Sequence, residues 1–170
     1  MIIIRREEEK DYIQIYEMVK NAFATAEHKS GTEQDLVTAL RQSGRFIPEL
    51  ALVAEKDGMI VGYALFTRMK VGDVPALTLA PLAVLPGYQR QGVGTRLIEE
   101  GHRIAAKLGF ELSVLVGSEH YYPRMGYRPG RELGLTSSLD LPDQNFMAID
   151  LTGRDRVFHC TAVFADEFLD

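Results

Sequence analysis

The sequence contains little cysteine and no tryptophan. Cys160 is its only cysteine, so the chain cannot form an intrachain disulfide or carry a two-cysteine redox motif. We interpret Cys160 as a structural residue, since a lone cysteine usually behaves as a small apolar side chain. No two of the four histidines have the spacing of metal ligands. We therefore expect no metal cofactor.

Long apolar runs and an excess of basic charge are also missing. No stretch approaches the roughly 20 apolar residues that span a membrane, and the short run at residues 2–4 is followed at once by charges, unlike a signal-peptide core. The formal net charge of −5 argues against a broad nucleic-acid surface. We expect a cytoplasmic protein that binds neither a membrane nor a nucleic acid.

The overall composition is typical of a globular protein. The chain has 170 residues, of which 46% are hydrophobic and 25% charged, enough for one domain with a sizeable core. We therefore expect a single domain over residues 1–170.

Residues 76–109 form the most informative stretch. An apolar run at 76–85 is closed by Pro86 and Gly87 and predicts a buried strand that ends in a turn. Apolar residues then recur at helical spacing from Val93 to Leu108, and Gly109 supplies the stop. The sequence predicts a strand, a glycine-containing turn and a helix.

The turn at residues 89–94 predicts an anion site. The first N–H groups of a helix are unpaired and lie at the positive end of its dipole. Gly92 and Gly94 let a phosphate approach these amides, Arg90 adds positive charge and Gln89 can donate hydrogen bonds. A P-loop fails because Gly92 is followed by Val93-Gly94 and not by Lys and Ser or Thr, and a dinucleotide fingerprint fails because Gly94 is followed by Thr95-Arg96-Leu97. A pyrophosphate is the expected ligand.

The other elements surround this unit in the order βααβββαβαββ. We expect strands at 2–4, 50–55, 59–69, 111–116 and 146–151, another beginning at Tyr127, helices at 12–23 and 33–42, and a short helix at 121–125. We expect loops at 24–32 and 130–145 and a type I′ turn at Asp57-Gly58. Residues 157–164 form either a further strand or surface packing. This order predicts an α/β sandwich with a mixed sheet.

Two motifs resemble the GNAT superfamily of N-acyltransferases. Gln89, Gly92 and Gly94 match its acyl-coenzyme-A signature, Gln/Arg-x-x-Gly-x-Gly/Ala, and residues 121–127 are similar to its Tyr-x-x-x-Gly-Phe/Tyr segment. The resemblance extends over nearly the whole chain. It implies a GNAT-type mixed central sheet of about seven strands flanked by about four helices.

The resemblance also implies acetyl-CoA as the acyl donor. The amides of residues 91–95 would hold its pyrophosphate beside Gln89 and Arg90, and backbone groups at a bulge in the preceding strand would pair with the pantetheine arm. The cofactor residues that it assigns are Leu82, Ala83, Val84, Gln89, Arg90, Gln91, Gly92, Val93, Gly94 and Thr95.

The implied chemistry is direct attack of a primary amine on the acetyl thioester. Tyr122 occupies the position of the acid that protonates the leaving thiolate, with Tyr121 as an adjacent competitor, and a phenol with a pKa of about 10 is protonated at neutral pH. An N–H near Val84 would stabilise the oxyanion.

The general base that deprotonates the amine is harder to identify, because residues 78–81 of the central strand supply no carboxylate. We choose Glu33, since the two N-terminal helices form the acceptor wall in this family; Glu49, Glu119, His120 and a water chain stay open. The chain also has Val116-Gly117-Ser118-Glu119 where many relatives carry an Asn that contacts the pantetheine.

The expected partner is a small-molecule or peptide amine, and the family includes homodimers. The alternative function is a non-catalytic module that senses acyl-CoA, because the missing strand carboxylate and the missing Asn bear on turnover more than on the pyrophosphate site.

Overall fold

The computed structural model describes residues 1–24 and 30–169, which divide into two compact units. Unit 1 comprises the described residues of Met1–Phe66 and Ala80–Gly101, and unit 2 those of Thr67–Leu79 and His102–Asp170. Residues 25–29, in the loop that we predict at 24–32, lie outside the described residues. The expectation of a single domain over 1–170 stays a prediction.

The described residues form a mixed sheet and three α-helices, which confirms the predicted GNAT-type α/β architecture. The helices are α1 (Tyr12–Phe23), α2 (Glu33–Arg41) and α3 (Val93–Lys107). The strands are β1 (Ile2–Arg6), β2 (Phe46–Lys56), β3 (Met59–Val71), β4 (Val74–Val84), β5 (Leu112–Val116), β6 (Arg128–Pro129), β7 (Leu135–Ser137), β8 (Phe146–Asp150) and β9 (Cys160–Val163).

The element counts differ slightly from the expected seven strands and four helices. The described residues form nine strands; the two beyond the expected seven are β7 and β9, which are three and four residues long. The short helix predicted at 121–125 is the 3-10 helix η3 (Tyr122–Met125), and Gly126 ends it with a φ of 96°. No helix of the described segments is long and apolar enough to cross a lipid bilayer.

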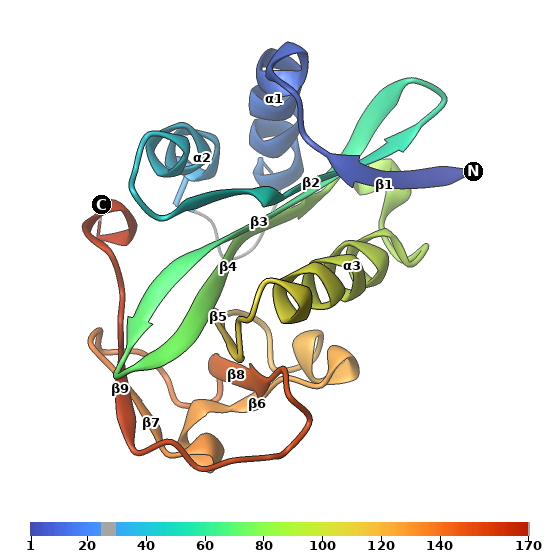
Figure 1. Cartoon of the computed structure of the whole chain (residues 1–170). Coiled ribbons are helices and arrows are strands. Elements are labelled where there is room, and N and C mark those ends of the chain that lie inside the picture. Colours follow the sequence, from blue (N-terminus) through green and yellow to red (C-terminus); the bar gives the residue numbers. More distant parts are fainter. Residues whose placement is uncertain (25–29, 170) are drawn as a thin grey trace. The chain divides into compact units, whose positions relative to one another are not determined.

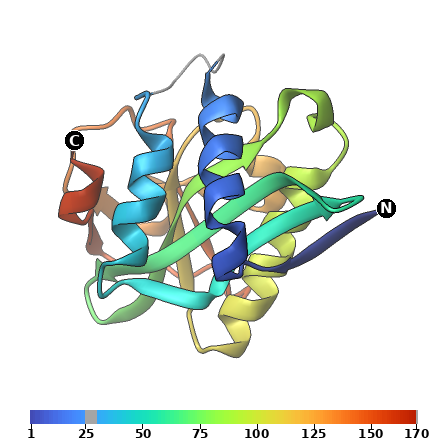
Figure 2. The same cartoon turned by 90° about the horizontal axis from the view of Figure 1, so that it is seen from above.

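Unit 1 is a sheet covered by helices on both faces. α1 and α2 lie on one face of β1–β3 and the first part of α3 on the other (Figure 1), and α1 and α2 lie side by side (Figure 2). β1 pairs antiparallel with β2, with Ile2 opposite Lys56. Asp57 and Gly58 have φ angles of 52° and 81°, as the type I′ turn between β2 and β3 requires.

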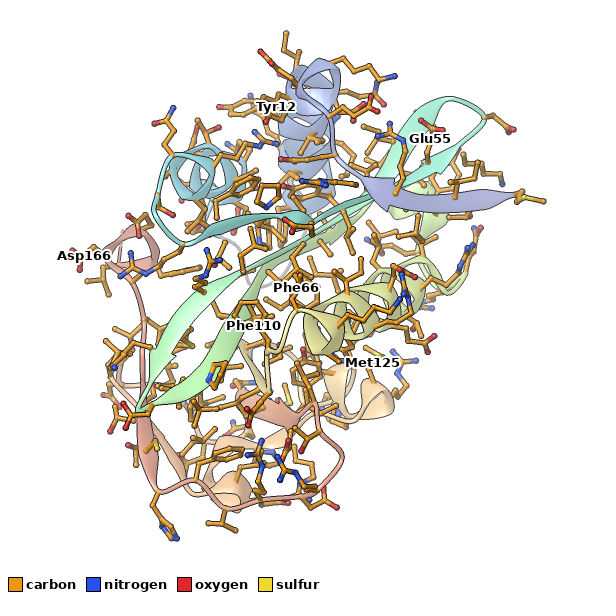
Figure 3. All side chains as sticks on the ribbon, viewed as in Figure 1. Tyr12, Glu55, Phe66, Phe110, Met125 and Asp166 are labelled. Carbon is orange, nitrogen blue, oxygen red and sulfur yellow. The ribbon has the colours of Figure 1, made fainter. Side chains whose placement is uncertain are left out.

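Small residues let α3 approach the sheet closely. A Cβ atom on Gly62 would lie 2.9 Å from Val93 Cγ1 and 3.1 Å from Leu97 Cδ1. Phe66, which Figure 3 labels, packs in the same way against the Cα of Gly101. The start of α3, and with it the end of the preceding turn, is therefore held against β3 by close packing.

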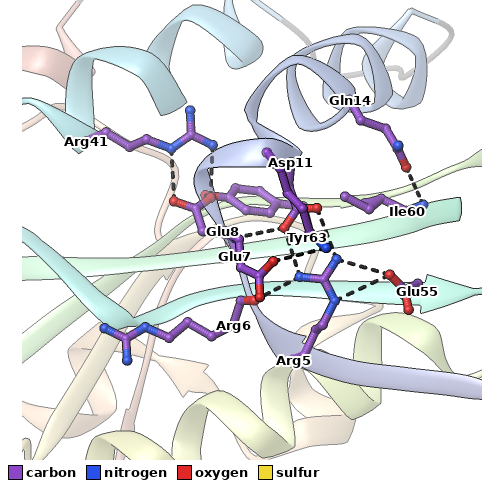
Figure 4. Close-up of polar contacts among 11 residues, drawn as sticks. Arg5, Arg6, Glu7, Glu8, Asp11, Gln14, Arg41, Glu55, Ile60 and Tyr63 are labelled. Atoms are coloured by element: carbon purple, nitrogen blue, oxygen red, sulfur yellow. Dashed lines mark hydrogen bonds and ion pairs between the residues drawn. The ribbon is translucent and has the colours of Figure 1, made fainter. Parts of the chain in front are cut away.

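A buried polar network fixes α2 on the other face (Figure 4). Arg41 donates two hydrogen bonds of 2.9 Å to the Glu7 carboxylate, and the hydroxyl of the buried Tyr63 donates a third at 2.8 Å. Glu7 is 8% exposed, so these hydrogen bonds replace the water that its carboxylate has lost. Arg5 forms two ion pairs nearby, with Asp11 at 2.8 Å and with Glu55 at 3.0 Å.

Unit 2 has its own core around the parallel pair β4 and β5. Ala76 pairs with Leu112 and Thr78 with Val114; β5 then pairs antiparallel with β8, and β8 with β6. β9 joins the far end of β3 and runs parallel to β7. The buried side chains of this core are Met69, Val71, Ala76, Leu112, Val114, Leu133, Leu135, Phe146, Ala148, Ala162 and Phe164.

Candidate functional site

The turn between β4 and α3, in unit 1, is open to solvent. After the 3-10 helix η2 (Pro86–Tyr88), residues 89–92 are all exposed. Gly92 has a φ of 83°, and no other side chain or backbone atom lies within 4 Å of the place where its Cβ would be. Arg90 is also left-handed, with a φ of 61°. Such a backbone is uncommon for a residue with a side chain, and it concentrates at binding loops.

Two glutamine side chains hold this turn in shape. The amide of Gln89 donates to the Val84 carbonyl at 3.1 Å, and the amide of Gln91 donates to the Gly87 carbonyl at 3.2 Å. Gln89 was expected to donate to a pyrophosphate. In the structure one donor of this side-chain amide joins the end of β4 to the turn, and its contact with a pyrophosphate stays a prediction.

The helix that follows begins next to Gly92. Its first hydrogen bond runs from the Arg96 N–H to the Gly92 carbonyl, at 3.0 Å. The N–H groups of Val93 and Gly94 precede this bond, and by helix geometry they have no carbonyl partner along the helix. The Arg96 guanidinium donates to the Ile2 carbonyl at 2.9 Å, which anchors this first turn on β1. That an anion binds at this turn stays a prediction.

The end of β4 contains the predicted pantetheine contacts. Pro81 has no N–H group, so it interrupts the hydrogen-bond ladder just before Leu82, Ala83 and Val84. Leu85 then donates to the Val61 carbonyl at 2.9 Å. Since the Val84 carbonyl accepts from Gln89, that acceptor is already used within the chain.

Tyr122, the predicted acid, lies in unit 2 at the start of η3. Its half-buried ring makes edge contacts with Tyr121, at a centroid distance of 4.9 Å, and with Tyr127, at 6.0 Å. Burial raises the pKa of the Tyr122 phenol above its usual value, with a smaller contribution from Tyr121. The phenol is therefore protonated at neutral pH and can act only as a proton donor there.

Tyr127 is the fixed neighbour of Tyr122. Its hydroxyl lies 2.8 Å from Ser113 Oγ and 2.9 Å from His102 Nε2, and the residue is only 1% exposed. Burial lowers the pKa of His102 to about 4, so this imidazole is neutral near pH 7. Ser113, Tyr127 and His102 thus form a neutral hydrogen-bonded chain, and its central residue, Tyr127, contacts Tyr122.

The loop after β5 is tied to Asn145. The Gly117 N–H donates to the Asn145 carbonyl at 2.9 Å, and the Asn145 side-chain amide donates to the Gly117 carbonyl at 3.0 Å. The same amide donates to Glu119 Oε2 at 2.7 Å, and the other Glu119 oxygen lies 3.2 Å from His120 Nε2. Two of the open base candidates, Glu119 and His120, thus form a pair close to Tyr122 in the chain.

The other base candidates lie in unit 1. Both Glu33 oxygens accept hydrogen bonds from the preceding loop, one from the Ser30 N–H at 2.7 Å and the other from the Gly31 N–H at 3.1 Å. The Glu33 carboxylate therefore holds the residues just before α2 in place. Glu49 lies within β2, 3.8 Å from the Arg6 guanidinium, and is about half exposed.

Gly117 and Asn145 were missed as site residues by the sequence reasoning. Gly117 carried a weak signal, because it directly follows a buried strand and precedes the Tyr122 motif. Asn145 carried none, since it lies among turn residues 28 positions away from Gly117. Within the described parts of the chain, no three His, Cys, Asp or Glu side chains are grouped so that they could hold a metal ion.

The known proteins that this chain resembles are acetyltransferases. The family model described as an acetyltransferase (GNAT) domain matches residues 48–129, which include both motifs. The uncharacterized N-acetyltransferase YjhQ of Escherichia coli K12 is 37% identical over 118 residues, or 66% of this chain. The match covers 65% of YjhQ, so the chain spans slightly less than two thirds of that relative.

Solved structures match over nearly the full chain. The GNAT family N-acetyltransferase YhbS from Escherichia coli, in complex with CoA, superposes with a TM-score of 0.88 at 25% identity, over 99% of this chain and 92% of that one. A GNAT family acetyltransferase from Brucella melitensis, in complex with acetyl-CoA, gives 0.81 at 26% identity, over 99% and 98%. In its motifs, its relatives and its fold, this chain belongs to the GNAT superfamily of N-acyltransferases.

Proposed function

We propose that this protein transfers the acetyl group of acetyl-CoA to a primary amine. The observation that carries the proposal is the exposed turn at residues 89–92, with left-handed Arg90 and Gly92 and open space beside Gly92, at the start of α3. The two compared structures contain CoA and acetyl-CoA, which supports the same donor here.

The residues present fit this donor. A pyrophosphate needs backbone N–H donors, positive charge and room, and the turn offers the N–H groups of Val93 and Gly94, the Arg90 guanidinium and the open side of Gly92. The amides of residues 91–95 would hold the pyrophosphate, with Gln89 bracing the turn beside it. Backbone groups of Leu82, Ala83 and Val84 would pair with the pantetheine amides.

In the proposed reaction the amine nitrogen bonds to the thioester carbonyl carbon, and the carbon–sulfur bond then breaks. The amine loses a proton to a base, and Tyr122 gives a proton to the departing thiolate. Burial favours this role, because the raised pKa keeps the Tyr122 phenol protonated over the whole neutral range. An N–H near Val84 would stabilise the tetrahedral oxyanion.

We propose Glu33 as the base. Its two carboxylate oxygens accept hydrogen bonds from Ser30 and Gly31, so taking up a proton requires that one of these bonds is released or that a water molecule relays the proton. The pair formed by His120 and Glu119 is the strongest alternative, because the carboxylate can orient the imidazole. Glu49 and a water chain are the others.

Replacing Tyr122 with Phe tests the proposal. Thiol release from acetyl-CoA would be followed with a panel of small-molecule amines and amine-bearing peptides, and acetyl-CoA binding by calorimetry. Loss of a general acid should lower turnover at least about 100-fold, while the Kd for acetyl-CoA changes less than about twofold because the phenol is not a binding group. Tyr121→Phe is the matched control and should keep its turnover.

The other outcomes separate the alternatives. Turnover that survives Tyr122→Phe would remove this residue from the mechanism. Tight acetyl-CoA binding without turnover on any amine would favour the non-catalytic sensor. Failure of the native protein to bind acetyl-CoA would refute both functions.

A further inference from the structure

The ring of Tyr122 rests directly on the backbone of Gly117. A Cβ atom at position 117 would overlap Tyr122 Cε2 and lie 2.9 Å from Cδ2 and 3.3 Å from Cζ. The Gly117 backbone is not left-handed, so its conformation suits any residue. Glycine is therefore required at this position by the ring alone, not by the backbone.

Neither side of this contact can move away easily. On one side, the Tyr122 ring meets Tyr127, which is buried and hydrogen-bonded to Ser113 and His102. On the other side, the Gly117 N–H and carbonyl are both bonded to Asn145, at 2.9 and 3.0 Å. A side chain at position 117 would therefore push the ring of Tyr122 out of its place, since the backbone is held.

We propose that Gly117 is a positioning residue for Tyr122: it sets where the phenol lies, by leaving the space that the ring fills. The inference rests on the proposed function, because the catalytic meaning of this place comes from the acid role of Tyr122. Proton transfer requires donor and acceptor within hydrogen-bond distance, so a displaced phenol should lower turnover without changing acetyl-CoA binding.

The position of the ring can be measured without an acceptor. Fluorotyrosine incorporated at all seven tyrosines gives fluorine NMR signals, and the Tyr122 signal is assigned by its absence in Tyr122→Phe. Gly117→Ala should shift this signal. Gly44→Ala is the matched control, because no atom lies within 4 Å of that Cβ position and the Gly44 backbone is not left-handed; it should leave the signal unchanged.

Kinetics then test whether Gly117 acts through Tyr122. With an amine that supports turnover, Gly117→Ala should lower kcat about 10- to 100-fold, with the Kd for acetyl-CoA within about twofold. In the Tyr122→Phe background the same substitution should cost little more, because the phenol that it displaces is already absent. A residue with only a structural role would instead give additive losses.

Two results would overturn the inference. One is a Tyr122 signal that does not move in Gly117→Ala; the other is a full kcat in Gly117→Ala while Tyr122→Phe is inactive. Turnover that survives Tyr122→Phe overturns the proposed acid, and with it the catalytic meaning of Gly117, even where the signal shifts. If Gly117→Ala does not fold, restored folding in Gly117→Ala/Tyr122→Ala would show that the ring is the source of the clash, whereas no restoration would count against it.

Discussion

The loop after β4 and the loop after β5 both follow strands of the same parallel pair, yet they use glycine in opposite ways. Gly92 has a left-handed backbone and open space where a side chain would be, whereas Gly117 has an ordinary backbone and no space at all. The loop after β4 is exposed to solvent, with open space beside Gly92. The loop after β5 is filled by the side chain of Tyr122 and tied to Asn145.

This difference separates two requirements of a transferase. A donor that arrives from solution needs free amides, so the loop after β4 must stay open. A proton donor must already be in place when the reaction begins, so the loop after β5 must be filled. Substitutions in the first loop should therefore change binding and spare the fold, and substitutions around the second should change stability or turnover and spare binding.

Gly92→Glu should produce the largest effect. A carboxylate at this position adds bulk and negative charge where the pyrophosphate is proposed to bind, so acetyl-CoA affinity should fall more than about 1,000-fold. Calorimetric titration measures this. Gly92→Ala is the control: it shares the left-handed strain, which costs about 1 kcal/mol of stability, but adds little bulk and no charge. Equal losses of binding in the two variants would contradict the comparison.

Protonation of His102 should make the stability of the protein depend on pH. The His102 pKa of about 4 in the fold lies below the unfolded value of about 6.5, so the unfolded state binds more protons between these values. Stability is complete above pH 6.5 and is lost as the pH falls toward 4, by up to about 3 kcal/mol. Urea unfolding of the native protein and of His102→Gln measures this dependence.

His102→Gln keeps a hydrogen-bonding group for the Tyr127 hydroxyl but cannot titrate. Its stability should therefore fall less steeply between pH 6.5 and 4. Below that range another group takes over: burial opposes ionisation of Asp150, but hydrogen bonds from Arg156 and Thr152 outweigh it and hold the Asp150 pKa well below its usual value. Parallel pH profiles for the two proteins above pH 4 would exclude His102 as the cause.

Asn145→Ala should have the smallest effect. It removes the two side-chain hydrogen bonds to Gly117 and Glu119, which together contribute about 1–2 kcal/mol. Urea unfolding should show this loss, while acetyl-CoA binding stays unchanged. Asn21→Ala, at an exposed position of α1, is the control and should not destabilise the protein. Weaker acetyl-CoA binding in Asn145→Ala would show that the two loops are not independent.

The open loop could be predicted from the sequence because the residues that form it are contiguous. The strand, Gln89, Gly92 and the helix start follow one another, so spacing alone indicated an anion site. The contacts of Tyr122 could not be predicted in this way. Gly117 and Asn145 are 28 residues apart, and Glu7 meets Tyr63 across 56, so their pairing depends on strand register that no local pattern specifies.

The short strands were only partly predicted, for a related reason. The sequence predicts a strand that begins at Tyr127, next to β6, and either a strand or surface packing at 157–164, where β9 lies, but β7 was missed. These strands contain two to four residues, too few for an alternating pattern to stand out among the neighbouring glycines and prolines. The base is a harder case still. Sequence reasoning chose Glu33 from its place in the family, and the hydrogen bonds from Ser30 and Gly31 belonged to a loop whose shape the residues alone did not predict.

The exposed turn at residues 89–92 also bears on the choice of buffer. Inorganic phosphate and sulfate carry negative charge and oxygen acceptors as a pyrophosphate does, so under the proposed function they would compete for this turn and make acetyl-CoA binding look weaker than it is. Tris is itself a primary amine and could be consumed as an acceptor. Under the proposed function, two of the commonest buffers would each imitate one substrate, and a true blank needs a buffer that imitates neither.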